Sequence, residues 1–174
     1  RVSREMVTPF NRKIYQTLIE RQKEGKDIEL SAQTIQKGDL VLMCHIPSLG
    51  PLLHEQCVES YKNAYNYFKD ELKDGTLGIR CDSWLLMPDY MELFKECSPN
   101  IYKFAKDYEI FGVDYTENFT VGWRIFNTDV NERNTENLSQ VTKLQKGFVE
   151  YINKGGKFGS GKGMLFFDGE NLCD

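Results

Sequence analysis

The sequence predicts an α/β protein with a mixed sheet, built on a parallel strand–helix–strand core and followed by an antiparallel hairpin. The first observation is an apolar, β-rich run at 40–46 that leads through a Gly/Pro turn into an amphipathic segment at 54–72. The second is another apolar run at 77–86, because two strands joined by one helix pair in parallel through a right-handed crossover. The third is a pair of β-rich runs, 108–115 and 120–127, separated by a polar turn.

The size and charge of the chain limit the classes of protein to which it can belong. Its 174 residues are enough for one well-buried core and too few for two full domains, so we expect one domain. Lysine and arginine number 22 against 26 aspartates and glutamates, which argues against nucleic acid as a partner. No apolar run approaches the roughly 18 residues of a membrane span, and no secretory leader is visible. We therefore expect no membrane association and a cytoplasmic location.

The cysteines and histidines do not form a recognisable metal or disulfide pattern. The five cysteines are odd in number and never stand as Cys-x-x-Cys, so reduced cytoplasmic thiols fit best. The only two histidines, His45 and His54, are nine positions apart and lack carboxylates at a ligand spacing. We expect no metal.

The elements before the first apolar strand are expected to be a helix and the first strand of a hairpin. Thr8-Pro9 suits an N-cap followed by a first-turn proline. We assign 1–26 to this helix, as a remnant of an upstream region or a segment that packs against one. Apolar residues then alternate through 28–34, and a Gly-containing turn brings that run back onto 40–46. The domain itself is expected to comprise 27–174.

The elements after the second strand are predicted from periodicity and turn residues. A helical region begins near Pro88 and is interrupted at Ser98-Pro99, where a new N-cap and proline start a short helix. Apolar residues through 138–152 recur at helical spacing, and Gly155-Gly156 ends that helix. A short strand at 164–167 follows.

The turn between the first strand and its helix is the first candidate for a ligand site. Four backbone N–H groups at a helix start lack internal partners, and the helix dipole adds about half a positive charge there. Strand, Gly/Pro turn and helix is therefore an arrangement that binds anions. We expect phosphates at 48–53.

A second glycine-rich stretch nearly spells a phosphate-binding P-loop: Gly156-Lys157-Phe158-Gly159-Ser160-Gly161-Lys162-Gly163. Gly163 stands where a serine or threonine should hold magnesium, and the stretch follows a helix instead of opening one. We interpret it as a helix-to-strand connection. A lesser role, lending Lys157 or Lys162 to a phosphate bound elsewhere, stays open.

Four side chains are candidates for proton transfer. His45 lies near the end of the first strand, where an imidazole can take a proton from an amine; the alternative is a hydrogen-bonded histidine within the fold. Ser83, Tyr90 and Tyr102 follow the second strand, and ligands gather at the carboxyl ends of parallel strands. For each tyrosine the alternative is packing, because the chain has nine of them. His54, in the first turn of a helix, is expected on the surface.

Four short segments are distinctive in combination: Cys44-His45-Ile46-Pro47-Ser48-Leu49-Gly50-Pro51-Leu52, Cys81-Asp82-Ser83-Trp84-Leu85-Leu86, Ser98-Pro99-Asn100-Ile101 and Gly155-Gly156-Lys157. With them the chain, over roughly 40–167, resembles a bacterial group of GNAT-like acyltransferase domain proteins. In that group the GNAT-like part forms the C-terminal domain behind a separate N-terminal one. The resemblance implies a GNAT-like mixed central sheet in which the two central parallel strands splay apart.

The resemblance also implies an acyl-CoA-dependent N-acyltransferase. Acetyl-CoA or another acyl-CoA would be the co-substrate, and a small-molecule or peptide amine would attack the thioester directly. The pantetheine arm would lie between the splayed strands, with main-chain partners from Cys44 to Ile46. The turn would receive the pyrophosphate through Ser48, Leu49, Gly50, Leu52 and Leu53. His45 or a water it holds would be the base, Tyr90 or Tyr102 the acid, and Ser83 a positioning group.

The turn differs from the general GNAT pattern Q/R-x-x-G-x-G/A. Leu49 stands where relatives often have a second glycine, and Pro51 has no N–H to offer. These differences favour a second hypothesis, a non-catalytic ligand-binding or interaction module on a degenerate GNAT scaffold.

Overall fold

Strands and helices alternate along the chain in the computed structural model of the protein. The structure describes residues 2–3, 40–47, 50–72, 75–128, 130 and 135–173. The described elements, with η marking a short 3-10 helix, are β1 (Val2–Ser3), β2 (Val41–Met43), α2 (His54–Phe68), η1 (Lys69–Glu71), β3 (Leu77–Ser83), η2 (Trp84–Leu86), η3 (Pro88–Tyr90), α3 (Met91–Cys97), α4 (Pro99–Lys106), β4 (Glu109–Thr116), α5 (Trp123–Phe126), α6 (Lys143–Asn153) and β5 (Phe158–Phe167). The predicted α/β class is confirmed.

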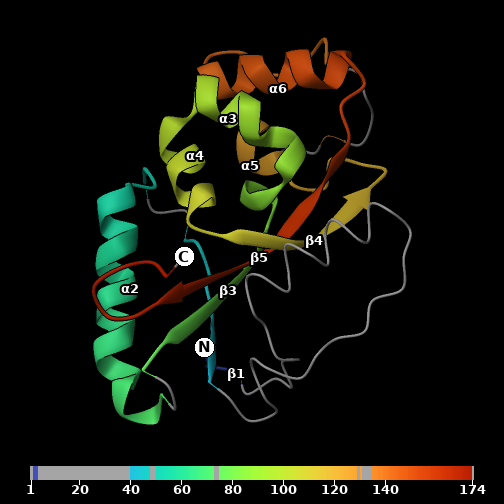
Figure 1. Cartoon of the computed structure of the whole chain (residues 1–174). Helices are drawn as coiled ribbons and strands as arrows, with labels where there is room; N and C mark the ends of the chain where they lie inside the picture. Colours follow the sequence, from blue (N-terminus) through green and yellow to red (C-terminus); the bar gives the residue numbers. More distant parts are fainter. Residues whose placement is uncertain are drawn as a thin grey trace, which may run out of the picture. The chain divides into compact units, whose positions relative to one another are not determined.

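The described strands form a mixed sheet in the order β1-β2-β3-β5-β4. β1 and β2 are antiparallel, whereas β2 and β3 are parallel, with Val41 opposite Gly78 and Met43 opposite Arg80. These two parallel strands are the cyan and green ones in Figure 1, and α2 connects them along the chain. The predicted parallel strand–helix–strand core is therefore confirmed.

Both parallel strands are shorter than the apolar runs that predicted them. β2 ends at Met43, before the end of the 40–46 run, and β3 ends at Ser83. The last residues of the second run form η2, because the Ser83 hydroxyl oxygen accepts the N–H of Leu85 at 3.2 Å and caps a helical turn there. The apolar composition of both runs reflects buried side chains, and only part of each run is a strand in the sheet.

Contacts between residues divide the chain into two compact units. Unit 1 comprises Arg1–His45, Val58–Arg80 and Met164–Asp174, and unit 2 comprises Ile46–Cys57 and Cys81–Gly163. α2, β3 and β5 each run from one unit into the other. Each unit has buried apolar side chains of its own.

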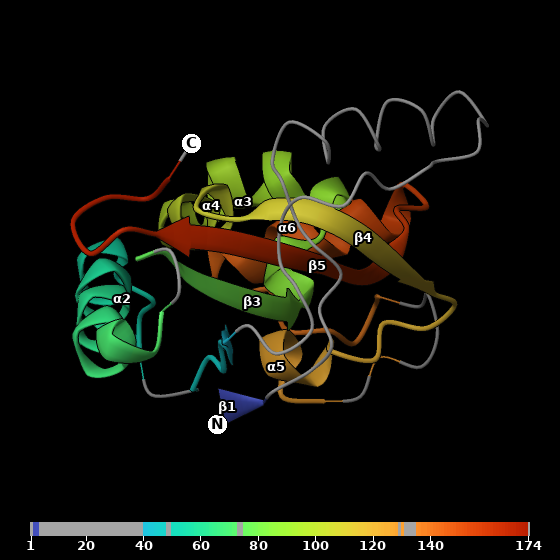
Figure 2. The ribbon, with the colours of Figure 1, turned by 60° about the horizontal axis from the view of Figure 1, so that its bottom comes forward.

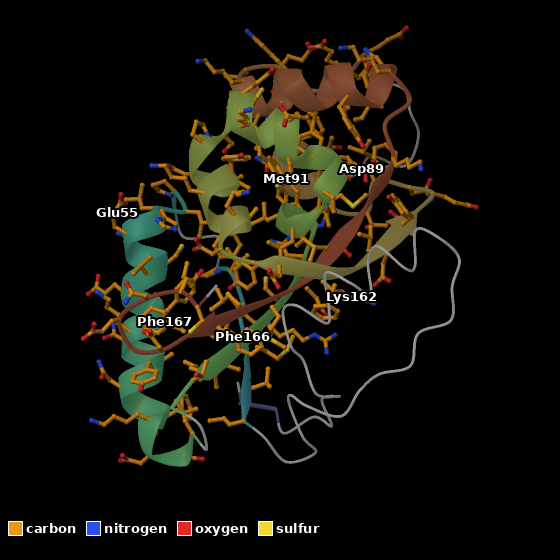
Figure 3. The ribbon with its side chains drawn as sticks, viewed as in Figure 1. Glu55, Asp89, Met91, Lys162, Phe166 and Phe167 are labelled. Carbon is orange, nitrogen blue, oxygen red and sulfur yellow. The ribbon has the colours of Figure 1, made fainter. Side chains whose placement is uncertain are left out.

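Unit 1 is built from the parallel strand pair, most of α2 and the C-terminal part of β5, on which Figure 3 labels Phe166 and Phe167. The ring of Phe167 lies 6.3 Å from that of Tyr61 and 6.1 Å from that of Tyr65, both on α2. Tyr61 and Phe167 are buried, so ring packing holds this part of α2 against the end of β5.

Unit 2 is built around a cluster of aromatic rings. Tyr90 lies 5.1 Å from Phe148, and Phe119 stacks on both Phe148 and Phe158 at 5.2 and 4.9 Å between ring centroids. These rings come from η3, α6, β5 and the loop after β4, while α3 packs against α4 and α6, as Figure 2 shows. All four rings are buried, so they form part of the core of this unit.

The glycine-rich stretch forms the first half of β5 and is not a loop. Our interpretation of 156–163 as a connection is therefore wrong for all but its first residues, and the predicted strand at 164–167 begins instead at Phe158. Gly159, Gly161 and Gly163 alternate, so they share one face of the strand. A Cβ on Gly161 would overlap the carbonyl oxygen of Leu86. At Gly159 and Gly161, a side chain is excluded because a main-chain carbonyl oxygen, from Asp114 and from Leu86 respectively, approaches closely.

The predicted antiparallel hairpin at 108–127 is wrong in its second strand. Residues 123–126 form α5, and the neighbour of β4 in the sheet is β5. The buried residues Phe119, Gly122 and Phe126 are three and four positions apart, which is a helical period. A Cβ on Gly122 would lie 2.6 Å from a methyl carbon of Val130, so packing excludes a larger residue here. Aromatic and β-branched composition had favoured a strand.

The last helix, α6, starts later than the predicted 138–152. Thr142 caps this helix. Its hydroxyl oxygen accepts the main-chain N–H of Gln145 at 3.1 Å, and the side-chain oxygen Oε1 of Gln145 accepts the main-chain N–H of Thr142 at 3.0 Å. Val141 lies before this capping box and is 84% exposed. The sequence pattern Thr-x-x-Gln was the better signal for the start of the helix. Of the helix predicted in 1–26, only Val2 and Ser3 are among the described residues, and they form β1 instead. The rest of that helix and the strand predicted at 28–34 lie outside the described residues.

We predict that Gly161→Ala lowers the free energy of unfolding by about 3 kcal/mol, because the new methyl group meets main chain that cannot move aside. Gly112→Ala on β4 is the matched control, since its Cβ would lie 3.4 Å from the flexible side chain of Lys162. We expect that control to change stability by no more than about 0.5 kcal/mol. Urea unfolding of both variants measures the difference, and equal losses would contradict the close-approach argument.

Candidate functional site

The parallel pairing of β2 and β3 stops well before the end of β3. The last paired residues are Met43 and Arg80, and beyond them the N–H of Cys44 donates to the carbonyl oxygen of Arg80 at 2.7 Å. β3 continues to Ser83, whereas β2 has already ended. The N–H of Cys44 is thus used within the sheet, and the expectation that Cys44 gives a ligand a main-chain partner stays a prediction that concerns its carbonyl oxygen.

The turn that follows β2 leads directly into α2. Gly50 has a φ of +122°, a conformation that favours glycine, and it is exposed. The N–H of Leu53 donates to the carbonyl oxygen of Pro51 at 3.0 Å. Ser48 and Leu49, which were also predicted to hold phosphate, lie outside the described residues.

The amides of the first turn of α2 are divided into two groups. The N–H groups of Gln56 and Cys57 both donate to the carbonyl oxygen of Leu53, at 3.1 Å. The N–H groups of His54 and Glu55 donate to no acceptor within the described part of the chain. Two backbone donors are therefore available at the positive end of the α2 dipole.

The side chains around this helix start carry little net positive charge. Glu55, labelled at the N-terminal end of α2 in Figure 3, is exposed and complements the helix dipole with its carboxylate. Leu52 and Leu53 are half-buried. An anion bound here would depend on main-chain donors, since these neighbouring side chains are apolar or acidic.

His54 is paired with a carboxylate, which the sequence did not reveal. Its Nε2 lies 2.9 and 3.1 Å from the two carboxylate oxygens of Asp107, the residue that caps the C-terminus of α4. The side chains are 30% and 7% exposed, respectively. The expectation of a surface histidine is wrong, because the two residues are 53 positions apart and no local pattern links them.

His45 lies just after β2 and is exposed. Its ring has no hydrogen-bond partner within the described residues, so the alternative of a hydrogen-bonded histidine inside the fold is not what the structure has.

Tyr90 is fully buried in the aromatic cluster of unit 2. Its hydroxyl oxygen accepts the N–H of Gly159 at 3.3 Å, and burial raises the pKa of its phenol. A phenol so enclosed is a poor proton donor to a bound ligand. These contacts favour the packing alternative for Tyr90 over a role as an acid.

Ser83 and Tyr102 belong to two other elements of unit 2. The Ser83 hydroxyl caps η2, so its oxygen is used as an acceptor while its proton stays available for donation. Tyr102 on α4 is half-buried, and its hydroxyl has no hydrogen-bond partner among the described residues. Of the two candidate tyrosines, Tyr102 therefore has the more accessible phenol.

The two lysines of the glycine-rich stretch contact side chains on β4. Nζ of Lys162, labelled in Figure 3, lies 2.7 Å from a carboxylate oxygen of Asp114. Nζ of Lys157 lies 5.1 Å from the ring centroid of Tyr115, whose hydroxyl donates to Asp89 at 3.1 Å. Lys162 thus already has an anionic partner.

Two features are absent from the described residues. They contain no group of three or more histidine, cysteine, aspartate or glutamate side chains arranged to hold a metal ion. Within the same part of the chain, no helix combines the length and apolar character needed to cross a bilayer.

Comparison with known families returned a match over most of the chain. The model of a family described as the GNAT-like C-terminal domain matches residues 10–165. The resemblance that we drew from four short segments agrees with this match. No curated protein matches the chain.

Several solved structures share this fold. An acyltransferase in complex with decanoyl-CoA matches with a TM-score of 0.57 and 22% identity, over 73% of this chain and 40% of its own. An acyltransferase in complex with CoA and 10C-Teicoplanin matches with a TM-score of 0.57 and 20% identity, over 73% and 41%. A complex with decanoyl-CoA and teicoplanin gives 0.55 and 20%, over 76% and 42%. The chain spans about two fifths of the length of these acyltransferases.

We predict that Tyr90→Phe lowers the free energy of unfolding by about 1–3 kcal/mol, because the buried N–H of Gly159 loses its acceptor. Tyr102→Phe is the control, because it removes a hydroxyl that accepts no hydrogen bond from a main-chain N–H of the described residues. We expect that change to stay within about 0.5 kcal/mol. Urea unfolding measures both; if Tyr90→Phe is as mild as the control, the structural role assigned to the Tyr90 hydroxyl is wrong.

Proposed function

The chain belongs to the family of GNAT-like C-terminal domains, and on that premise we propose that it binds an acyl-CoA and transfers its acyl group to an amine. The described strands, turn and helix of the site support this proposal. So do the similar solved structures, which are acyltransferases with decanoyl-CoA or CoA bound. The acceptor that we propose is a small-molecule or peptide amine.

One observation supports the proposal most: the β2–β3 ladder stops at Cys44 and Arg80, while β3 runs on to Ser83. A pantetheine arm contains two amide groups and can bind like a short extra strand. We propose that it lies beside Ile46, where the parallel pairing has ended. The arm would then continue the hydrogen bonding that β2 no longer provides.

The diphosphate of CoA is proposed to bind at the turn from Gly50 to Leu53 and at the start of α2. The amides of His54 and Glu55 are the available donors there, and the helix dipole adds favourable charge. Gly50, with its positive φ and no side chain, lets the main chain come close to a phosphate. No basic side chain is needed for this mode of binding.

The chemistry is a direct acyl transfer without a covalent enzyme intermediate. The amine attacks the thioester carbonyl carbon, the C–S bond breaks, and the thiolate of CoA leaves. One proton must pass from the amine to a base, and one must return to the thiolate. We propose His45, or a water that it holds, as the base. Tyr102 is the proposed acid, and Ser83 is a positioning group.

A second candidate function is a non-catalytic binding module on the same scaffold. The burial of Tyr90 favours it, because one of the two predicted acids is committed to packing. The use of the Cys44 amide within the sheet favours it as well. The two candidates differ in one measurable property: both bind a CoA ligand, and only the enzyme releases free CoA when an amine is supplied.

A ligand titration followed by a transfer assay tests the proposal. Acetyl-CoA, a longer acyl-CoA and CoA at 1 mM should each be compared with buffer in thermal unfolding. A ligand with a Kd of about 10 µM would stabilise the fold by about 2.7 kcal/mol at that concentration. Thiol release in the presence of a panel of amines then separates the enzyme from the binding module. No stabilisation by any of the three ligands would count against both candidates.

We predict that Gly50→Val weakens CoA binding at least about tenfold, because a β-branched residue does not tolerate a φ of +122° and the turn must change shape. Gly75→Val is the matched control: its φ is +74°, and a Cβ there would also meet nothing within 4 Å. Calorimetric titration with CoA measures both variants. Equal CoA affinities in the two would mean that the cofactor lies elsewhere.

We also predict that His45→Ala lowers kcat by about 10²–10⁴-fold, the usual contribution of a general base. CoA affinity should stay within about twofold of the wild type, because the imidazole is proposed to act on the amine. Steady-state kinetics and a CoA titration on the same preparation measure the two effects. An unchanged kcat would remove His45 from the mechanism.

A further inference from the structure

The His54–Asp107 pair has no part in the function proposed above. Nε2 of His54 is within hydrogen-bond distance of both oxygens of Asp107, at 2.9 and 3.1 Å, and that carboxylate is only 7% exposed. Both residues belong to unit 2. A carboxylate this enclosed is stable when its oxygens accept hydrogen bonds, so the histidine contributes to its environment.

The geometry of the pair fixes the orientation of the histidine ring. Since Nε2 faces two acceptor oxygens, it carries the proton in the neutral imidazole. Nε2 of the His54 ring is therefore held by Asp107 at the C-terminal end of α4. His54 is also the first residue of α2, so the same contact fixes the position of the start of that helix relative to the C-terminal cap of α4.

The start of α2 is also where the two available amides lie. The N–H of His54 and the N–H of Glu55 have no acceptor within the described residues, whereas Gln56 and Cys57 donate to Leu53. His54, whose ring contacts Asp107, thus also carries the first of these two main-chain donors. A shift of the His54 main chain, which the contact with Asp107 opposes, would move that donor.

We propose that Asp107 is a positioning residue for the diphosphate of CoA, acting through His54 on the amides at the start of α2. The inference rests on the proposed function and goes beyond it by assigning a role outside the turn itself. The thioester end of CoA lies away from these amides, so Asp107 affects the diphosphate end and leaves the pantetheine arm unchanged.

The test uses two substitutions of different severity. Asp107→Ala removes both acceptor oxygens, whereas Asp107→Asn keeps one oxygen that can accept the Nε2 proton. CoA affinity should fall about tenfold in the first and less in the second. Thr135→Val is the control, because it removes another part-buried side-chain hydrogen bond of unit 2, from Thr135 to Asn153 at 2.7 Å.

An amide NMR titration of the full chain with CoA gives a readout that loss of stability alone would not change. In the wild type and in Thr135→Val, CoA should shift the amides of His54, Glu55 and Ile46. In Asp107→Ala the Ile46 shift should persist while those of His54 and Glu55 shrink. Unchanged affinity with unchanged His54 and Glu55 shifts in Asp107→Ala would overturn the role of Asp107. A wild-type chain without any CoA response overturns the proposed function itself.

Discussion

The close approach of the Leu86 carbonyl to Gly161 is the constraint on which unit 2 depends. Side chains are absent at alternate positions of β5, so main chain following β3 can lie against main chain of β5. η2 begins directly after Ser83, where β3 ends, and Leu86 is its last residue. Beyond η2, the Tyr90 hydroxyl accepts the N–H of Gly159, and aromatic rings pack around Tyr90. A stretch that nearly spells a phosphate-binding loop is therefore a strand that contributes to the core of unit 2.

The candidate site follows a different principle, because it depends on main-chain groups that secondary structure leaves unused. The N–H of Cys44 already donates to Arg80 at the end of the parallel strand pair. The N–H groups of Gln56 and Cys57 already donate to Leu53 at the helix start. In the first turn of α2, the donors that remain among the described residues belong to His54 and Glu55. A site of this kind needs no basic side chain, which is consistent with a chain whose net charge is −4. It does need an accurately positioned helix start, and the contact between His54 and Asp107 is the one that we propose to provide it.

Sequence reasoning predicted the parts of the fold that local periodicity controls and missed those that depend on distant contacts. The strand–helix–strand core was predicted because apolar period and turn residues agreed over 40–86. The segment at 120–127 was assigned to a strand, because its composition favours strands while its burial at positions 119, 122 and 126 follows a helix. The His54–Asp107 contact had no local signal at all. For the candidate site, the sequence indicated the turn, but it could not tell which amides the fold would use.

The proline in the turn changes where an anion would be held. In the general GNAT pattern the amides of the turn itself face the pyrophosphate. Here Pro51 has no N–H, and its carbonyl oxygen accepts the N–H of Leu53, so two amides of the turn are lost to a ligand. The N–H groups of Leu52, His54 and Glu55 donate to no acceptor among the described residues, so under the proposed function the diphosphate lies between the turn and the start of the helix. There the carboxylate of Glu55 repels the diphosphate and the dipole of α2 attracts it. The His54–Asp107 pair lies at this same helix start, which is why its geometry bears on the proposed site.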